Sequence, residues 1–388
     1  MLNGVATGFS LSTDELVSVE FDGVLNRVEP VLDAAGHQDH FIAPGFIDLQ
    51  VNGFAGVDYN SPTAPQEEIA RSIEVMFSTG VTRFYATVIT GGPEPMMGAL
   101  RNLARAKERL PLHGQAMEAF HVEGPYICPD DGPRGAHPRQ WARMPDLDEF
   151  RRYQEAAAGH IRLVTVSPEW PNAIGFIEEV VRMGVVVSIG HTKADSRQIA
   201  DAVKAGATMS THLGNGAHKM IVRHPNYIFD QMAEDKLAAS FIADGIHLGK
   251  SFLKAAIRAK SVQRSVLVTD AVMPAGCAPG DFMLGEVPVT LHADESVTLR
   301  DGSGRLAGSS LKMDRAIGTV VQLAEISLRD AVTMATTNAA RVGRVGGRVR
   351  GLQPGDRADL VEFSYAEGAD RLTVLRTWLS GQLVYSRN

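Results

Sequence analysis

Four polar residues that closely follow apolar runs have side chains that could share one catalytic site. They are Glu123, His191, His212 and Asp270. Runs of Val, Ile and Leu are typical of buried parallel strands, and in barrel enzymes the reacting groups lie where such strands end. We therefore expect these four side chains to meet at one end of a barrel, although they are spread over residues 123–270.

The residue types fit metal-assisted hydrolysis. Two neutral imidazoles and one carboxylate form the ligand set of a catalytic zinc-type site, in which one coordination position stays open for water. A bound metal lowers the pKa of that water and so produces a nucleophile near neutral pH. The alternative is that each histidine makes a structural hydrogen bond and that Asp270 caps the next turn. Because the same placement recurs after four runs, the pattern favours a metal site.

An alternation of apolar runs and helical patterns supplies the elements that would position these residues. Eight runs with helices between them predict an α/β fold, a (β/α)8 TIM-like barrel of parallel strands. A doubly wound sheet is the alternative, but no glycine-rich phosphate-binding motif follows the first run. The runs are Gly45–Val51, Thr82–Ile89, Met117–Val122, Ile161–Val166, Val185–Ile189, Ala207–Thr211, Ala239–Ala243 and Ser265–Thr269.

The predicted helices begin and end between those runs, and several are followed by glycine, which suits the residue after a helix. After Asp270 the chain is rich in turn-forming residues, and two more helices then close the barrel. The helices are Gln66–Ser78, Pro95–Leu110, Leu147–Ala158, Asn172–Met183, Ser196–Ala205, Lys250–Lys260, Lys312–Glu325 and Leu328–Arg341.

Both ends of the chain have a different sequence pattern: short segments in which apolar and polar residues alternate, which predict β-strands. We expect residues 1–43 and 344–388 to pair as one small β-sandwich domain, and residues 44–343 to form the barrel. The expected terminal strands are Leu16–Phe21, Arg27–Leu32, Asp359–Phe363, Leu372–Leu379 and Gln382–Tyr385.

The composition excludes several classes of protein. The chain has 388 residues, 44% of them hydrophobic, and a net charge of −7 without a block of Lys or Arg, which argues against nucleic-acid and membrane partners. Cys128 and Cys277 form neither a disulfide framework nor a zinc-finger spacing. The N-terminus lacks a signal-peptide pattern, and no apolar run is long enough to span a bilayer. We expect a soluble cytoplasmic protein.

Several motifs, taken together, resemble those of N-acetylglucosamine-6-phosphate deacetylases, a branch of the metal-dependent amidohydrolase superfamily. The similar segments occur in the order found in that family, so the resemblance covers most of the chain. They are Ala43–Gly53, His121–Pro125, Gly135–Pro138, Gly190–Thr192, Thr211–Leu213 with Asn215, Asp244–His247, Val268–Ala271 with Pro274–Gly276, and Leu306–Ser310.

The resemblance implies a barrel enzyme that hydrolyses the acetamido group of N-acetylglucosamine 6-phosphate to glucosamine 6-phosphate and acetate. It implies that Glu123, His191 and His212 bind the metal. Asp270 would then take a proton from the attacking water and give it to the leaving nitrogen, and His137 would help to stabilise the oxyanion. We expect one divalent ion, Zn²⁺ in the first place, although Fe²⁺, Co²⁺ or Mn²⁺ can use the same ligands.

The same resemblance implies contacts with the sugar phosphate and a homodimer in which some contacts cross the interface. Without it, Arg223 would be interpreted as a surface charge and Ala307–Gly308 as a turn. An arginine fork suits a phosphate because it donates two parallel hydrogen bonds. The residues that match substrate contacts of the family are His137, Asn215, Gly216, Arg223, His247, Ala307 and Gly308.

Two departures from common patterns qualify the expected substrate and metal content. Many amidohydrolases have His-x-His after the first strand and hold two metals, whereas this chain has Gln50 and Asn52, which favours one ion. The loop Gly214–His218 and the following His224 also differ from the family's usual sequence. The alternatives are therefore another N-acetylated amino sugar or an N-acyl amino acid as substrate, and, more remotely, an inactive barrel that only binds its ligand.

Overall fold

The computed structural model describes residues 4–31 and 40–387. Leu32, the last residue of one predicted strand, and parts of the predicted range 1–43 lie outside the described residues. No helix in the described ranges is long and apolar enough to cross a membrane.

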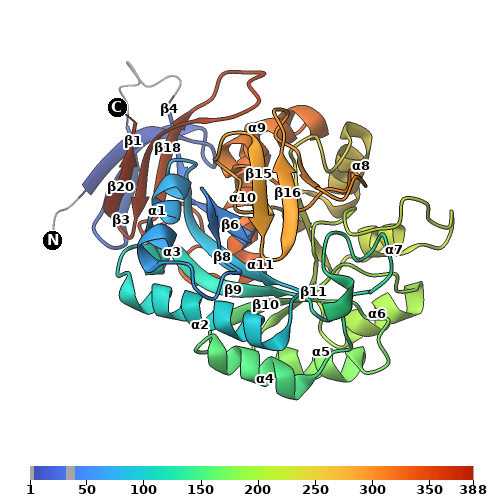
Figure 1. Ribbon diagram of the computed structural model, residues 1–388. Coiled ribbons are helices and arrows are strands. Elements are labelled where there is room, and N and C mark those ends of the chain that lie inside the picture. Colours follow the sequence, from blue (N-terminus) through green and yellow to red (C-terminus); the bar gives the residue numbers. More distant parts are fainter. Residues whose placement is uncertain (1–3, 32–39, 388) are drawn as a thin grey trace.

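An eight-stranded parallel sheet forms the centre of the molecule (Figure 1), and its strand order follows the chain. Beyond the last strand, the backbone N–H of Asp270 donates to the carbonyl oxygen of Gln50 at 3.0 Å, and a parallel bridge joins Val51 to Ala271. These bonds close the sheet into the predicted barrel. The strands are β5 (Phe46–Val51), β8 (Val81–Ile89), β9 (Met117–Glu123), β10 (Ile161–Val166), β11 (Val186–Ile189), β12 (Met209–Ser210), β13 (Ala238–Phe241) and β14 (Ser265–Leu267).

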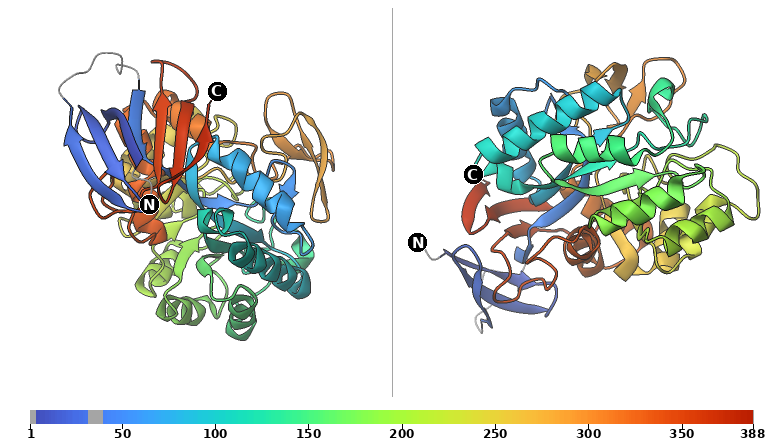
Figure 2. Two further views of the ribbon diagram at one scale, coloured as in Figure 1. Left: turned by 90° about the vertical axis from the view of Figure 1, so that its left-hand side faces the viewer. Right: turned by 90° about the horizontal axis from the view of Figure 1, so that it is seen from below.

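Helices cover the outside of this sheet (Figure 2), and the longer ones, such as α1, α2 and α5, bury one mainly apolar face. In α5, for example, Phe176, Ile177 and Val180 are buried at the spacing of one helix face. The helices are α1 (Gln66–Phe77), α2 (Pro93–Arg109), α3 (His113–Ala116), α4 (Leu147–Ala156), α5 (Ala173–Arg182), α6 (Ser196–Lys204), α7 (Tyr227–Ala233), α8 (Lys250–Lys260), α9 (Met313–Ala324), α10 (Leu328–Ala335) and α11 (Thr337–Gly343).

The two chain ends form one seven-stranded sheet beside the barrel (Figure 1). Phe21 of β2 and Trp378 of β19 are separated by three strands in the sheet order, yet their rings lie 5.9 Å apart. The sheet therefore folds over a small core of its own, as predicted for a β-sandwich. Its order is β20 (Gln382–Ser386), β19 (Thr373–Leu379), β18 (Leu360–Ser364), β4 (His40–Pro44), β1 (Gly4–Ser10), β2 (Glu15–Phe21) and β3 (Leu25–Pro30).

A buried ion-pair network joins the two parts. Asp359 accepts hydrogen bonds from Arg83 Nε of β8 at 2.8 Å and from Arg348 at 2.5 Å. All three side chains are at most 5% exposed. Burial opposes the ionised carboxyl, but the charges of Arg348 and Arg83 prevail and lower the pKa of Asp359 to about 2.

Two segments differ from the sequence-based expectation. The predicted helix Leu328–Arg341 is two helices, because Thr336 leaves the helical conformation with φ −126° and ψ −94°. In the turn-rich region after Asp270, an antiparallel three-stranded sheet forms from β15 (Gly280–Leu284), β16 (Val287–Leu291) and β17 (Val297–Leu299). These strands are short and partly exposed, so their apolar alternation is weak in the sequence.

Candidate active site

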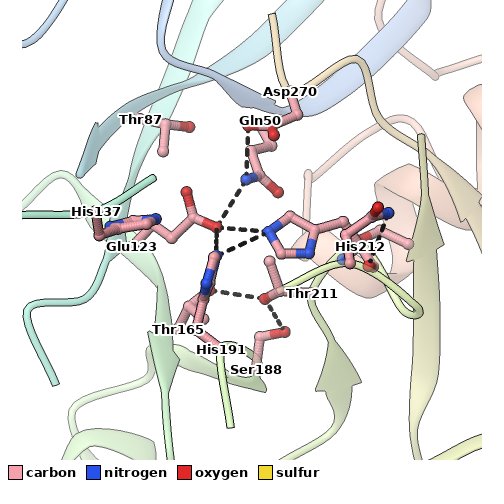
Figure 3. Close-up of polar contacts among 12 residues, drawn as sticks. Gln50, Thr87, Glu123, His137, Thr165, Ser188, His191, Thr211, His212 and Asp270 are labelled. Atoms are coloured by element: carbon pink, nitrogen blue, oxygen red, sulfur yellow. Dashed lines mark hydrogen bonds and ion pairs between the residues drawn. The ribbon is translucent and has the colours of Figure 1, made fainter. Parts of the chain in front are cut away.

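Glu123, His191 and His212 converge at the ends of β9, β11 and β12 (Figure 3). Oε1 of Glu123 lies 2.9 Å from Nε2 of His212 and 3.2 Å from Nε2 of His191. The two Nε2 atoms are 3.1 Å apart, and all three side chains are buried. Residues separated by up to 89 positions therefore direct their ligand atoms at one point.

This geometry fits a divalent ion. Tetrahedral ligands that bind an ion at about 2.0–2.2 Å lie about 3.3–3.6 Å from one another, which is close to the observed spacing. Nδ1 of His191 is 2.7 Å from the carbonyl oxygen of Pro133, which can only accept a hydrogen bond. With its proton on Nδ1, the His191 ring presents the lone pair of Nε2 to the point that Oε1 of Glu123 also faces, and this pair of atoms suits a divalent cation.

The carboxylate dominates the electrostatics of this cluster. Burial opposes ionisation of Glu123, but its polar contacts with the imidazoles of His191 and His212 hold the pKa of this carboxyl well below the usual value. Burial likewise disfavours a charged His212, yet its hydrogen bond to Glu123 and the negative charge raise the pKa of this imidazole. The buried carboxylate and the two imidazoles thus stabilise one another, and the cluster favours a positive charge at its centre.

Asp270 lies next to this cluster and is held by two side-chain amides. Its Oδ1 accepts hydrogen bonds from Nε2 of Gln50 at 3.0 Å and from Nδ2 of Asn52 at 2.7 Å. Gln50 Nε2 also donates to Oε1 of Glu123 at 3.0 Å. Burial, with repulsion from Glu123, raises the pKa of Asp270 to about 6. Both amide bonds fall on Oδ1, which leaves Oδ2 for a proton or a substrate.

Three of the clustered residues have left-handed backbone conformations. The φ angles of His191, His212 and Asp270 are +50°, +29° and +51°. Residues with a β-carbon rarely adopt this region, and each such residue costs on the order of 1–3 kcal/mol. Strain of this kind at the ends of three strands is typical of functional sites, where the surrounding fold holds side chains in a required direction.

A layer of buried hydroxyl groups supports the two histidines from below (Figure 3). Thr211, which precedes His212, contacts the hydroxyls of Thr165 at 2.7 Å and Ser188 at 2.6 Å. Thr165 in turn contacts Nε2 of His121 at 2.8 Å, and burial lowers the pKa of His121 to about 4. This neutral network fixes the strand ends from which the clustered side chains project.

His137 approaches the cluster from the loop after β9. Its ring packs edge-on against that of His191 with centroids 4.4 Å apart, and its Nδ1 lies 2.8 Å from the hydroxyl of Thr90. Burial and the nearby His191 lower the pKa of His137 to about 3, so this imidazole is neutral. The Thr90 hydroxyl can donate its one proton to Nδ1 of His137 or to the carbonyl oxygen of Glu123 at 3.4 Å; in the first case the proton of the ring is on Nε2.

A cavity of about 150 Å³ opens over these groups. His247, one of its lining residues, is fixed by a 2.6 Å contact between its Nδ1 and Oδ2 of Asp244. Arg223 does not line this cavity; it is exposed on the loop between β12 and α7, which extends away from the body of the subunit (Figure 1). The predicted site residues that do line it are Glu123, His137, His191, His212, Asn215, Gly216, His247, Asp270, Ala307 and Gly308.

Sequence reasoning did not assign roles to several residues of this site. Gln50 and Asn52 were interpreted only as lost metal ligands, whereas their amides hold Glu123 and Asp270. Their position directly after the first apolar run was the available signal. Thr90 and Asp244, which contact His137 and His247, also follow apolar runs, but their partners could not be read from the sequence.

Comparison with known proteins places the chain in a family. A model of the amidohydrolase family matches residues 41–384. The chain belongs to the amidohydrolase family. The N-acetylglucosamine-6-phosphate deacetylase of Bacillus subtilis is 33% identical over 84% of this chain and 81% of its own length. The human deacetylase of the same name is also 33% identical, over 89% of this chain and 83% of its own.

Other relatives of this amidohydrolase have a different sugar in their names. The N-acetylgalactosamine-6-phosphate deacetylase of Shewanella sp. is 32% identical over 94% of this chain and 90% of its own length. Among solved structures, a mutant N-acetyl-D-glucosamine-6-phosphate deacetylase from Mycobacterium smegmatis, in complex with N-acetyl-D-glucosamine-6-phosphate, superposes with a TM-score of 0.88. It is 26% identical, and each chain is covered completely.

Proposed function

We propose that this amidohydrolase hydrolyses the acetamido group of N-acetylglucosamine 6-phosphate to glucosamine 6-phosphate and acetate. The observation that carries this proposal is the convergence of a two-histidine, one-carboxylate cluster with Asp270 in one cavity. The relatives named as amino-sugar phosphate deacetylases support the choice of substrate.

In this proposal Glu123, His191 and His212 hold one divalent ion, with Zn²⁺ preferred and Fe²⁺, Co²⁺ or Mn²⁺ as alternatives. Such an ion supplies Lewis-acid polarisation of the amide carbonyl and makes water more acidic. Nε2 of His191 and Oε1 of Glu123 lie 3.2 Å apart in the buried cluster, which supports a cation at this point. A single ion is supported by Gln50 and Asn52, whose amides donate hydrogen bonds to carboxylates instead of binding a second ion.

Asp270 acts first as a base and then as an acid. Its Oδ2 takes a proton from the water whose oxygen bonds to the amide carbon. The same proton then passes to the sugar nitrogen, so that the C–N bond breaks and the amine leaves. The raised pKa of Asp270 suits both steps because the group can accept and release a proton near neutral pH. His137 donates from Nε2 to the oxygen that becomes negative.

The sugar phosphate contacts Asn215, Gly216, His247, Ala307 and Gly308 in the cavity. Arg223 reaches a phosphate only across a subunit boundary in this proposal, and the enzyme is a homodimer. This part is supported by the exposed loop that carries Arg223, where Met220 is 91% and Val222 is 69% exposed. Large apolar side chains exposed side by side on a protruding loop are typical of an interface.

N-acetylgalactosamine 6-phosphate is a second candidate substrate, because relatives named for each sugar have similar identities to this chain, 33% and 32%. The test is a panel of N-acetylglucosamine and N-acetylgalactosamine, each with and without the 6-phosphate, assayed by release of acetate. The proposal requires N-acetylglucosamine 6-phosphate to have the highest kcat/KM. A protein that contains no metal and releases no acetate from any of the four sugars would instead be an inactive binding barrel.

Two further expectations belong to this proposal. A cytoplasmic location is supported by the two free cysteines, Cys128 and Cys277. The division into a β-domain of residues 1–43 and 344–388 and a barrel of residues 44–343 also stays a prediction.

A further inference from the structure

A second cavity, of about 130 Å³, adjoins the one that contains Asp270. The two cavities share lining residues, among them Ile89, Val272 and Val287. We call this second cavity the side chamber. It extends from the shared residues into the space between the start of α2 and the β15–β16 hairpin, where Met96, Trp141 and Met273 form its wall.

The wall of the side chamber is suited to an apolar group. Two of the polar side chains that line it, Asn60 and Asp58, already bond to their neighbours, whereas Oδ1 of Asn52 has no hydrogen-bond partner among the described residues. Asn60 Oδ1 accepts from the backbone N–H of Ile89 at 2.8 Å, and Asp58 accepts from the backbone N–H groups of Asn60 at 2.8 Å and Gly285 at 2.9 Å. A sugar placed there would find few partners for its hydroxyl groups, whereas a hydrocarbon chain loses nothing.

The position of the side chamber relative to the reacting groups indicates which part of a substrate enters it. An amide has an amine side and an acyl side. Asn215 and His247, the proposed sugar-phosphate contacts, line the first cavity and not the side chamber. Asn52, which holds Asp270, lines both cavities. The acyl side of an amide bound beside Asp270 therefore faces the side chamber.

We propose that the side chamber receives the acyl group of the substrate, so that the enzyme hydrolyses N-acyl amino-sugar phosphates with apolar acyl chains longer than acetyl. An apolar cavity of about 150 Å³ holds one benzene ring, so the side chamber fits about six carbon atoms. The inference rests on the proposed deacetylase function and extends its substrate class. Water adds to the acyl carbon, the C–N bond breaks, one proton of the water goes to the leaving nitrogen to give the amine, and the chain leaves as a carboxylic acid, which gives its proton to the amine or to solvent.

The test is a series of glucosamine 6-phosphates that carry N-acetyl, N-butanoyl, N-hexanoyl or N-decanoyl groups, assayed by release of the free amine. We expect kcat/KM for the hexanoyl compound to stay within about tenfold of that for the acetyl compound, and to fall by about 100-fold for the decanoyl compound, which exceeds the chamber. Turnover of the acetyl compound alone would overturn this inference and leave the proposed function intact. Turnover of none of the four would overturn both.

A variant that fills the side chamber tests its role directly. Met273→Trp should lower the ratio of kcat/KM for the hexanoyl compound to that for the acetyl compound by about 30-fold. Met183→Trp, at the end of α5, is the matched control and should leave this ratio unchanged, because Met183 does not line either cavity. Thermal unfolding of both variants shows whether they fold. An unchanged ratio in folded Met273→Trp, or an equal loss for both compounds, would contradict an acyl-binding role.

Discussion

The side-chain amide of Asn52 donates a hydrogen bond of 2.7 Å to Oδ1 of Asp270. The bond joins the end of the first barrel strand to the end of the last, across the point where the barrel closes. It also stabilises the ionised form of Asp270 and so opposes the burial that raises the pKa of this carboxyl. Asn52 thus sets both the direction and the proton affinity of the proposed base.

Replacement of Asn52 should therefore change the pH profile. In Asn52→Ala the carboxylate of Asp270 loses a stabilising donor, so its pKa rises further. A base must be deprotonated to act, and the acid limb of kcat/KM should move to higher pH, by about one unit if the bond contributes about 1.4 kcal/mol. The measurement is kcat/KM from pH 5 to 9. An acid limb in the same place as in the wild type would show that Asn52 does not tune Asp270.

Asp270→Asn should retain the fold but lose the proton transfer. The amide is isosteric and can still occupy the space beside Gln50 and Asn52, but it cannot take a proton from water. General acid–base catalysis contributes on the order of 10²–10⁴-fold, and we expect kcat to fall by at least this factor. Release of acetate measures the loss, and metal content and thermal unfolding serve as controls. A variant with kcat within tenfold of the wild type would exclude Asp270 as the base.

Removal of the metal should destabilise the protein as well as inactivate it. Without a cation, the buried ligand atoms Glu123 Oε1 and His191 Nε2 lie 3.2 Å apart with no ion between them. A ligand that binds only the native state stabilises it by about 2.7 kcal/mol at 100 times its Kd. Dialysis against a chelator should lower the Tm, and addition of Zn²⁺ should restore both Tm and activity. His191→Ala should show a low Tm that Zn²⁺ does not raise.

Asp244→Asn should affect binding of the phosphate more than catalysis. Oδ2 of Asp244 lies 2.6 Å from Nδ1 of His247 and fixes its ring at the edge of the cavity. In the variant the ring loses its charged partner, and KM for the phosphorylated sugar should rise by about tenfold while kcat changes little. KM for the unphosphorylated sugar provides the comparison. An equal rise for both sugars would show that His247 does not act on the phosphate.

The sequence contained enough information for the barrel because its strands are buried on both faces. Val185–Ile189 and Met117–Val122 are mostly apolar runs, and their order in the sequence is their order in the sheet. The residues at their ends could be predicted to meet, and Glu123 and His191 do. The break of the last predicted helix at Thr336 and the strands of residues 280–299 were missed, since they depend on tertiary contacts more than on local periodicity.

Residues of the site could be predicted only where the residue type itself indicates a chemical role. Histidines and carboxylates at strand ends suggest a metal, so Glu123, His191 and His212 could be chosen. Amides such as Gln50 give no such signal, because their role here depends on a hydrogen bond to Asp270, 220 residues away in sequence. Arg223 was expected at the substrate, but it is exposed on a protruding loop and does not line the cavity.

The buried network around Asp359 should make stability depend on pH in the acid range. The pKa of this carboxyl is about 2 in the folded protein, against an ordinary value of 3.8. A lowered pKa means that the stabilisation is complete above about pH 4 and is lost as the pH falls through the folded pKa, with about 2 kcal/mol in total.

Asp359→Asn leaves Arg83 and Arg348 buried without their counter-charge and should cost about 3 kcal/mol at pH 7. Urea unfolding at pH 7 and pH 3 measures the effect. The difference in the free energy of unfolding between wild type and variant should be smaller at pH 3, because the wild-type carboxylate begins to be protonated there. An equal difference at both pH values would mean that packing of the side chain, and not its charge, holds the β-domain to the barrel.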